Sequence, residues 1–227
     1  MPTAKAAYPG AQEFVPETQK LERLSRAVQD CHGCDLYRDA TQAVFGLGAA
    51  HAALMAVGEQ PGDREDVEGE PFVGPAGRLL DEAFEAAGLD REAIYLTNAV
   101  KHFRFTRPRG KQRIHKSPAR WQVAACGPWL LAELEAVQPS VVVLLGATAG
   151  QAVYGPSFRV TASRGTALTW PDDRLHTTSP PTACVATAHP ASVLRSRQRT
   201  QDFESLVADL TVARDLQDRP GQGGTGS

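Results

Sequence analysis

The chain has 227 residues, 42% of them hydrophobic, and a formal net charge of −2. Its length and composition allow a substantial buried core and fit one domain better than two. Because no apolar stretch approaches the roughly 20 residues that cross a bilayer, and because the N-terminus lacks the basic region and apolar run of a secretory signal, we expect an intracellular, cytoplasmic protein without a membrane partner.

Four short apolar runs of strand length alternate with helical patterns along the chain. The runs cover residues 53–59, 93–100, 140–147 and 183–190, and each ends in a polar or glycine-rich turn. Residues 76–89 repeat apolar side chains at helical spacing, and residues 117–139 form a longer helical pattern that Ser117 and Pro118 begin. Strands that alternate with helices predict a three-layer α/β/α fold around a central four-stranded parallel sheet.

We expect residues 1–227 to form this single domain as a monomer, with an ordered core over about residues 12–212. The closing segment "RPGQGGTGS" predicts a disordered tail over residues 219–227, because glycine and serine favour flexible chains.

Basic side chains are concentrated in one segment. Residues 101–120 contain eight lysines and arginines and no acidic residue, which leaves 16 bases against 26 acids in the rest of the chain. An acidic body with one basic face suits a ligand whose phosphates must bind in one place, such as DNA. A solvated run of charge has the same composition, so this feature alone does not decide.

The four cysteines are too few for a disulfide scaffold and are more typical of a metal site in a reducing compartment. Cys31 and Cys34 have the two-residue spacing that suits one metal centre, and Cys126 offers a third thiolate from the long predicted helix. Cys184 lies within an apolar strand, where a small buried thiol is the commoner outcome.

Polar residues follow the predicted strands at the ends where ligands bind in parallel sheets. The first strand is followed by Glu59, Gln60, Asp63 and Phe72. Asn98 follows the second strand and His189 the fourth. Each of these residues taken singly is also typical of an ordinary turn or helix entry.

The joint order of these segments resembles the uracil-DNA glycosylase superfamily. "GEQPGDREDVEGEPFVGPAG", "TNAVKHF", "LLGATA" and "HPASVLR" are similar to the motifs of its iron-sulfur branch, family 4, and the resemblance covers roughly residues 12–212. Two features resemble the narrower UdgX group: Gln60 within "GEQPG", and the insertion "GKQRIHKSP", which is similar to that group's "KRRIH" loop. Gln112 replaces one arginine of that loop, while Arg113 and His115 stay in register.

The resemblance implies a pocket for a uracil that has left the base stack. Phe72 would stack on the ring, and the amide of Asn98 would pair with O4 and N3–H, a pattern that cytosine reverses. Gly58 and Asp63 would complete the uracil site, and His189 would stabilise the uracil anion that leaves.

The resemblance also implies that His115, rather than water, bonds to C1′ of the sugar and leaves the protein attached to DNA. A neutral imidazole with a pKa of about 6.5 is a competent nucleophile at pH 7. Glu59 would stabilise the sugar cation, and Glu59, Gln60 or Arg113 would orient the histidine ring, a choice that the sequence leaves open.

Phosphate contacts would supply affinity for uracil-containing DNA, which we expect to be single-stranded. The predicted contacts are Lys101, Arg107, Arg109, Lys111, Lys116 and Arg195.

Family 4 would have a cysteine after "NAVK", where this chain has His102. The resemblance therefore implies a 4Fe-4S cluster held by Cys31, Cys34, His102 and Cys126. The alternatives are a zinc site with the same four ligands and a cluster that uses Cys184. Glycosylase chemistry needs no electron transfer, so we expect the cluster to have a structural role.

Three functions follow as hypotheses. The first is a uracil-DNA glycosylase that becomes covalently linked to DNA through His115. The second is a glycosylase that uses water and turns over, and the third is a noncatalytic iron-sulfur protein that only binds DNA.

Overall fold

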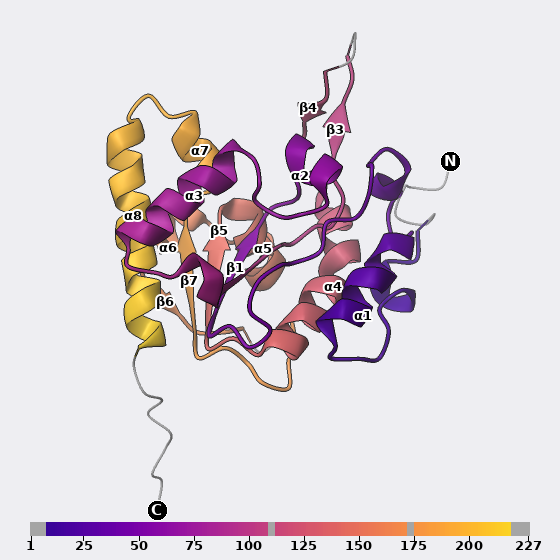
Figure 1. The fold of residues 1–227 in the computed structure, drawn as a ribbon, viewed down its shortest axis with the longest axis horizontal. Coiled ribbons are helices and arrows are strands. Elements are labelled where there is room, and N and C mark those ends of the chain that lie inside the picture. Colours follow the sequence, from indigo (N-terminus) through magenta and orange to yellow (C-terminus); the bar gives the residue numbers. More distant parts are fainter. Residues whose placement is uncertain (1–7, 109–111, 172–174, 219–227) are drawn as a thin grey trace, which may run out of the picture.

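A mostly parallel sheet forms the centre of the molecule (Figure 1). The computed structural model describes residues 8–108, 112–171 and 175–218. The parallel strands are β1 (Leu54–Gly58), β2 (Ile94–Asn98), β5 (Val141–Leu145) and β7 (Ala183–Thr187). The short strand β6 (Ala167–Leu168) adds an antiparallel edge, so that the order is β2-β1-β5-β7-β6.

The four parallel strands confirm the predicted sheet, and β6 is the strand that the prediction omitted. All five residues of each parallel strand are buried, as expected where helices cover both faces. β6 has only two residues, one exposed and one partly buried, and therefore leaves no apolar run in the sequence.

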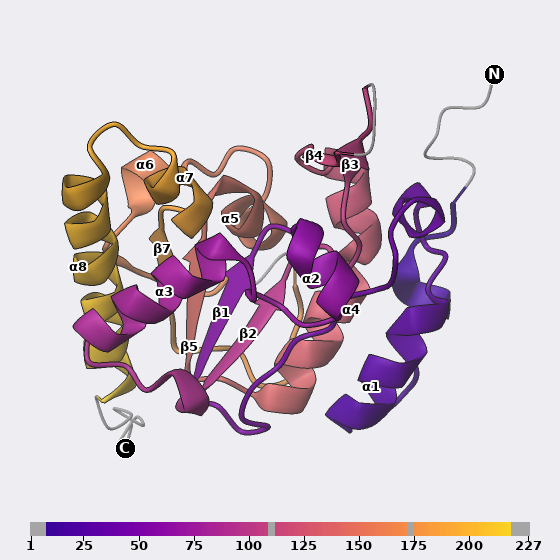
Figure 2. The same cartoon turned by 45° about the horizontal axis from the view of Figure 1, so that its top comes forward.

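Two layers of helices cover the sheet (Figure 2). Alternate residues of β1, such as Leu54 and Ala56, pack in one core cluster with α3 (Pro75–Ala86) and α8 (Arg199–Gln217). Met55 and Val57 point to the opposite face, where they pack in a second cluster with α4 (Arg120–Val137) and α5 (Ala147–Tyr154). The short helices α7 (Pro190–Leu194) and α6 (Val160–Ser163) flank β7, and η5 (Arg91–Ala93) precedes β2.

The helix predicted over residues 117–139 begins later than expected, at Arg120. Ala119 is its N-cap, and its backbone N–H donates to the side-chain oxygen of Gln122 at 2.7 Å. Ser117 stays outside the helix because its carbonyl accepts a hydrogen bond from the guanidinium of Arg104 at 2.6 Å.

The N-terminal segment packs against the outer side of α4 (Figure 1). It contains α1 (Leu21–Ala27) and the 3-10 turns η2 (Ala11–Glu13), η3 (Val28–Asp30) and η4 (Asp35–Arg38). Leu24 and Val28 are fully buried in a third core cluster together with Trp129 of α4. This cluster also contains three of the four cysteines.

A two-stranded hairpin rises above the carboxyl ends of the parallel strands (Figure 1). It pairs β3 (Phe105–Thr106) with β4 (Ile114–His115) and stands next to α2 (Asp63–Glu68). The predicted DNA contacts Arg109 and Lys111 lie outside the described residues, as does the predicted tail over residues 219–227. Among the described helices, none combines the length and the apolar character needed to cross a membrane.

Candidate active site

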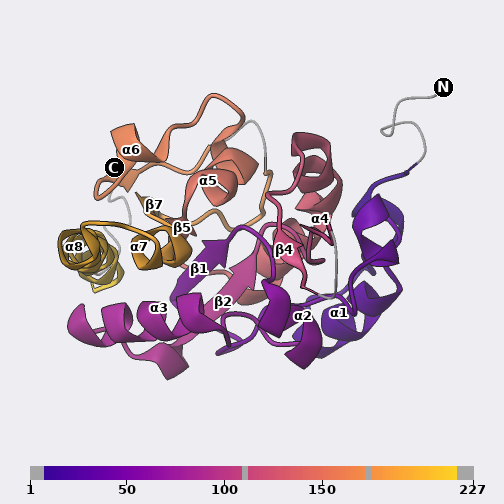
Figure 3. The same ribbon diagram turned by 90° about the horizontal axis from the view of Figure 1, so that it is seen from above.

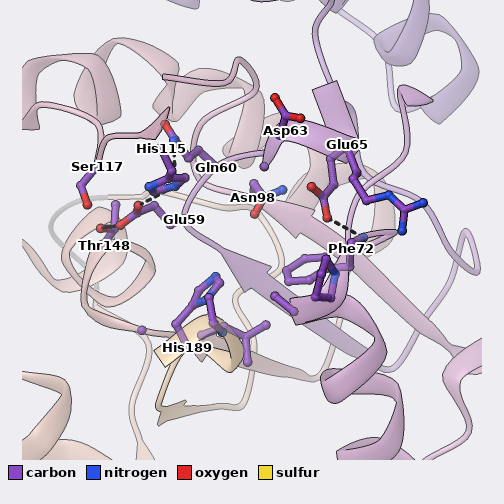
Figure 4. A pocket seen from close by; sticks show the side chains of 18 of the residues that line it. Glu59, Gln60, Asp63, Glu65, Phe72, Asn98, His115, Ser117, Thr148 and His189 are labelled. Atoms are coloured by element: carbon purple, nitrogen blue, oxygen red, sulfur yellow. Dashed lines mark hydrogen bonds and ion pairs between the residues drawn. The ribbon is translucent and has the colours of Figure 1, made fainter. Parts of the chain in front are cut away.

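A pocket of about 400 Å³ opens where the carboxyl ends of the parallel strands meet the hairpin (Figure 4). Glu59 and Gln60 enter it after β1, Asn98 ends β2, Thr148 lies in α5, and His189 follows β7. His115 comes from the hairpin and faces the same space. The fold therefore gathers around one cavity residues that are up to 130 positions apart in the sequence.

The floor of the pocket is built from Asn98 and Phe72, which are 3% and 8% exposed. Gly58 lies against both: a Cβ there would come within 2.3 Å of Asn98 Oδ1 and 2.7 Å of the Phe72 ring. Phe72 has a φ of 61°, a left-handed conformation that costs a non-glycine residue energy and often marks a functional site. An aromatic face beside a fixed amide suits a flat heterocycle.

His189 is held as the N-cap of α7. Its Nδ1 accepts a hydrogen bond from the backbone N–H of Ala191 at 3.1 Å, so the proton of the neutral ring must be on Nε2. Burial, reinforced by His115 and Arg195, lowers the pKa of His189 to about 4. At pH 7 the ring is therefore neutral and can donate Nε2–H to an oxygen in the pocket.

His115 faces a carboxylate across the pocket (Figure 4). Its Nε2 lies 3.5 Å from Glu59 Oε1, and the hydroxyl of Thr148 donates a short hydrogen bond to Glu59 Oε2. Thr148 thus holds one oxygen of the Glu59 carboxylate, Oε2, while the other oxygen, Oε1, faces His115. Burial lowers the pKa of His115, Glu59 opposes this shift, and Arg195 adds to it, so the imidazole is mostly neutral at pH 7.

Gln60 fastens the base of the hairpin. Its amide nitrogen donates to the carbonyls of Arg104 and Lys116, each at 3.2 Å, and its oxygen accepts from the backbone N–H of Arg104 at 3.2 Å. The same nitrogen lies 3.0 Å from His115 Nε2. These contacts suit a residue that positions His115.

Arg113 ties the hairpin to α2. Its guanidinium pairs with Asp63 and Asp66, each at 2.5 Å, and lies over the rings of Phe103 and Phe105. Only 11% of this side chain is exposed. Asp63 lines the pocket as expected, but its carboxylate is engaged by Arg113.

The predicted contact of Lys101 with DNA is wrong. This side chain is fully buried, pairs with Glu133 of α4 and donates to Thr97 Oγ1 at 2.7 Å. Its ammonium also donates to the carbonyl of Asn98 at 2.8 Å. Because Lys101 is buried, it cannot reach a phosphate. Its hydrogen bond to Asn98 instead supports the strand end that carries that residue.

The other predicted cations lie at the surface around the pocket. Arg107 and Lys116 are exposed on the hairpin, and Arg195 is exposed after α7 and lines the pocket. These cations are placed where a nucleic acid strand could contact them while one nucleotide enters the cavity.

Thr148 and Glu65 are among the site residues that were not predicted from the sequence. Thr148 gave a weak signal, because it follows the third predicted strand. Glu65 lines the pocket and accepts a hydrogen bond from the backbone N–H of Gly74 at 2.9 Å. Nothing distinguished Glu65 from the other acidic residues of its segment.

Three cysteines are buried in one core cluster between the N-terminal segment and α4. Cys31, Cys34 and Cys126 share the third core cluster, and the backbone N–H of Lys101 donates to Cys126 Sγ at 3.3 Å. Burial is the main cause that raises the pKa of Cys34 to about 11 and of Cys126 to about 12. Cys184 lies in the second core cluster instead.

His102 is buried at the strand end that follows β2, and burial lowers its pKa to about 4. Its ring is therefore neutral at pH 7, the form in which histidine binds a metal. Within the described residues, no group of three or more His, Cys, Asp or Glu side chains has the compact arrangement of a site for a metal ion.

The fold and this site define a class of protein. A family model described as the uracil DNA glycosylase superfamily matches residues 45–211, and the chain belongs to this superfamily. Among its relatives, the Type-4 uracil-DNA glycosylase of Archaeoglobus fulgidus is 35% identical over 189 residues, which cover 82% of this chain and 89% of the relative. The Type-4 uracil-DNA glycosylase of Thermotoga maritima is 36% identical over 178 residues, or 78% and 84%.

Proposed function

We propose that the protein is a uracil-DNA glycosylase that excises uracil from single-stranded DNA and becomes covalently linked to the abasic site through His115. The observation that carries the proposal is the position of His115 Nε2, which lines the pocket 3.5 Å from Glu59 and opposite Asn98 and His189. The Type-4 relatives support the glycosylase activity.

Recognition of uracil follows from the floor of the pocket. The amide of Asn98 can donate to O4 and accept from N3–H, and Phe72 offers a face on which the ring stacks. The buried ammonium of Lys101 donates a hydrogen bond to the backbone carbonyl of Asn98 and so holds the strand end that carries this amide. Cytosine offers the opposite donors and acceptors, so its binding would leave polar groups unpaired.

Cleavage breaks the C1′–N1 bond, and its electron pair leaves with uracil. The Nε2–H of neutral His189 can donate to the uracil oxygen on which negative charge develops. The carboxylate of Glu59, which Thr148 holds, can stabilise the positive charge that develops on the sugar.

The lone pair of His115 then forms the bond to C1′. The alkylated imidazole is a cation until its remaining N–H proton passes to solvent, and the neutral product is a poor leaving group. Attachment would therefore persist. A glycosylase that turns over would instead use Glu59 to orient a water molecule at the same carbon.

The test is a denaturing gel of the protein mixed with an oligonucleotide that contains one uracil. We expect a shifted band that survives heat and detergent, and we expect His115→Ser to abolish it. His51→Ser, which changes an exposed histidine before β1, is the matched control and should keep the band. Free abasic product from the wild-type protein without a shifted band would support turnover, and no dependence on uracil would leave only DNA binding.

We also infer that Cys31, Cys34, His102 and Cys126 hold a 4Fe-4S cluster. The support is that three thiols share one buried cluster, while Cys184 lies elsewhere in the core. His102 is buried at the strand end after β2, beside Lys101, whose backbone N–H donates to Cys126 Sγ. The cluster would fix the N-terminal segment to α4 and to the strand end after β2.

A further inference from the structure

A second pocket of about 390 Å³ lies between α4 and α5. Figure 3 shows these two helices as neighbours. The two pockets adjoin, because Thr148 lines both of them. They also meet at one backbone link, since Ser117 lines the first pocket and Pro118 the second.

The walls of this second pocket have the chemistry of a nucleoside site. They are formed largely by small apolar side chains, with the amide of Gln151 among them. Arg120 is exposed at the first residue of α4, where the positive end of the helix dipole adds to its charge. An apolar floor beside a cation suits a base with its phosphate.

We propose that the second pocket receives the nucleotide that adjoins the uridine in the same DNA strand. This inference rests on the proposed function, because it places the uridine in the first pocket. The strand must leave that pocket across its rim, and Thr148 lies on the boundary that the two pockets share. Arg120 then lies where the phosphate between the two nucleotides can contact it.

Gly127 offers a way to fill this pocket without disturbing the helix. A Cβ at Gly127 would have no atom within 4 Å, so a longer side chain there would extend into open space. Leucine is also a better helix former than glycine. Ala124, which is exposed and lines the same pocket, gives a second and independent position for a leucine.

The experiment measures the second-order rate constant for uracil release from three single-stranded oligonucleotides at protein concentrations below saturation. One oligonucleotide has normal neighbours, one has a baseless tetrahydrofuran spacer on the 5′ side of the uridine, and one has it on the 3′ side. For the wild-type protein, we expect one spacer, on the side that occupies the pocket, to lower the rate constant about tenfold, which corresponds to about 1.4 kcal/mol.

Gly127→Leu and Ala124→Leu should release uracil from the normal oligonucleotide about tenfold more slowly. They should also lose the difference between the two spacers. Ala86→Leu is the matched control, because it adds the same side chain to an exposed position of α3 outside both pockets. It should behave as wild type.

Wild-type rates in both pocket variants, or equal rates with the two spacers in the wild-type protein, would overturn this inference alone. A wild-type protein that releases no uracil from any of the oligonucleotides would overturn the proposed function.

Discussion

His115 and His189 face the same pocket, but they are held in different ways. His189 is fixed by a backbone hydrogen bond and keeps its pKa near 4, which suits a neutral donor. His115 is half exposed, on a hairpin, with a pKa that burial lowers less strongly. The two rings therefore suit different tasks, one as a fixed hydrogen-bond donor and the other as a nucleophile.

The lowered pKa of His115 gives a pH prediction. The attacking ring must be neutral, and its pKa in the free protein lies below the usual 6.5, so the second-order rate constant for covalent attachment should be constant between pH 7 and 8. Below the pKa it should fall by about tenfold per pH unit, because one proton must leave. A rate that already falls between pH 8 and pH 7 would contradict this prediction.

At the scale of elements, the hairpin is held to the body of the protein by side chains. Gln60 closes its base, and Arg113 connects β4 to α2 through Asp63 and Asp66. Arg113 immediately precedes β4, and its guanidinium and the ring of His115 both lie against the ring of Phe103. We therefore expect the pairing of Arg113 to position His115, the proposed nucleophile.

Arg113→Lys tests this coupling because lysine keeps the charge but cannot form the two-pronged contact. We expect the rate of covalent attachment at saturating DNA to fall about tenfold, or about 1.4 kcal/mol. Arg107→Lys, on the exposed part of the same hairpin, should alter DNA affinity more than this maximal rate. An unchanged maximal rate in Arg113→Lys would show that the pairing does not position His115.

At the scale of the whole molecule, the three cysteines connect the N-terminal segment with α4 and with the strand end after β2. Cys31 and Cys34 share a core cluster with Cys126 of α4. Lys101 links this cluster to the pocket, because its backbone N–H donates to Cys126 Sγ and its ammonium donates to the carbonyl of Asn98. A cluster at this place would brace the uracil pocket from outside without taking part in the reaction.

Removal of a predicted ligand tests that arrangement. Cys126→Ser should lose bound iron and the visible absorption of an iron-sulfur cluster, and its melting temperature should fall because metal binding stabilises the folded state. Cys184→Ala should keep both signals, since that thiol lies in another core cluster. Loss of iron in Cys184→Ala alone would favour the alternative ligand set.

The sequence by itself determined the parallel strands and the polar residues at their ends. The strands are buried on both faces, so each one leaves a largely apolar run in the sequence. The carboxyl ends of parallel strands share one edge, so Asn98 and His189 could be assigned to one pocket before any contact was known. The order of the motifs along the chain also indicated the superfamily.

Only the tertiary structure decided which charged residues are exposed and which hold the site together. Lys101 belongs to the basic run, but it is buried in an ion pair with Glu133, which lies 32 positions later in the sequence. Arg113 finds its partners 47 and 50 positions earlier. Such pairings depend on how the elements pack, and the local pattern of a sequence does not record them. The second pocket has the same origin, because it exists only where α4 and α5 come together.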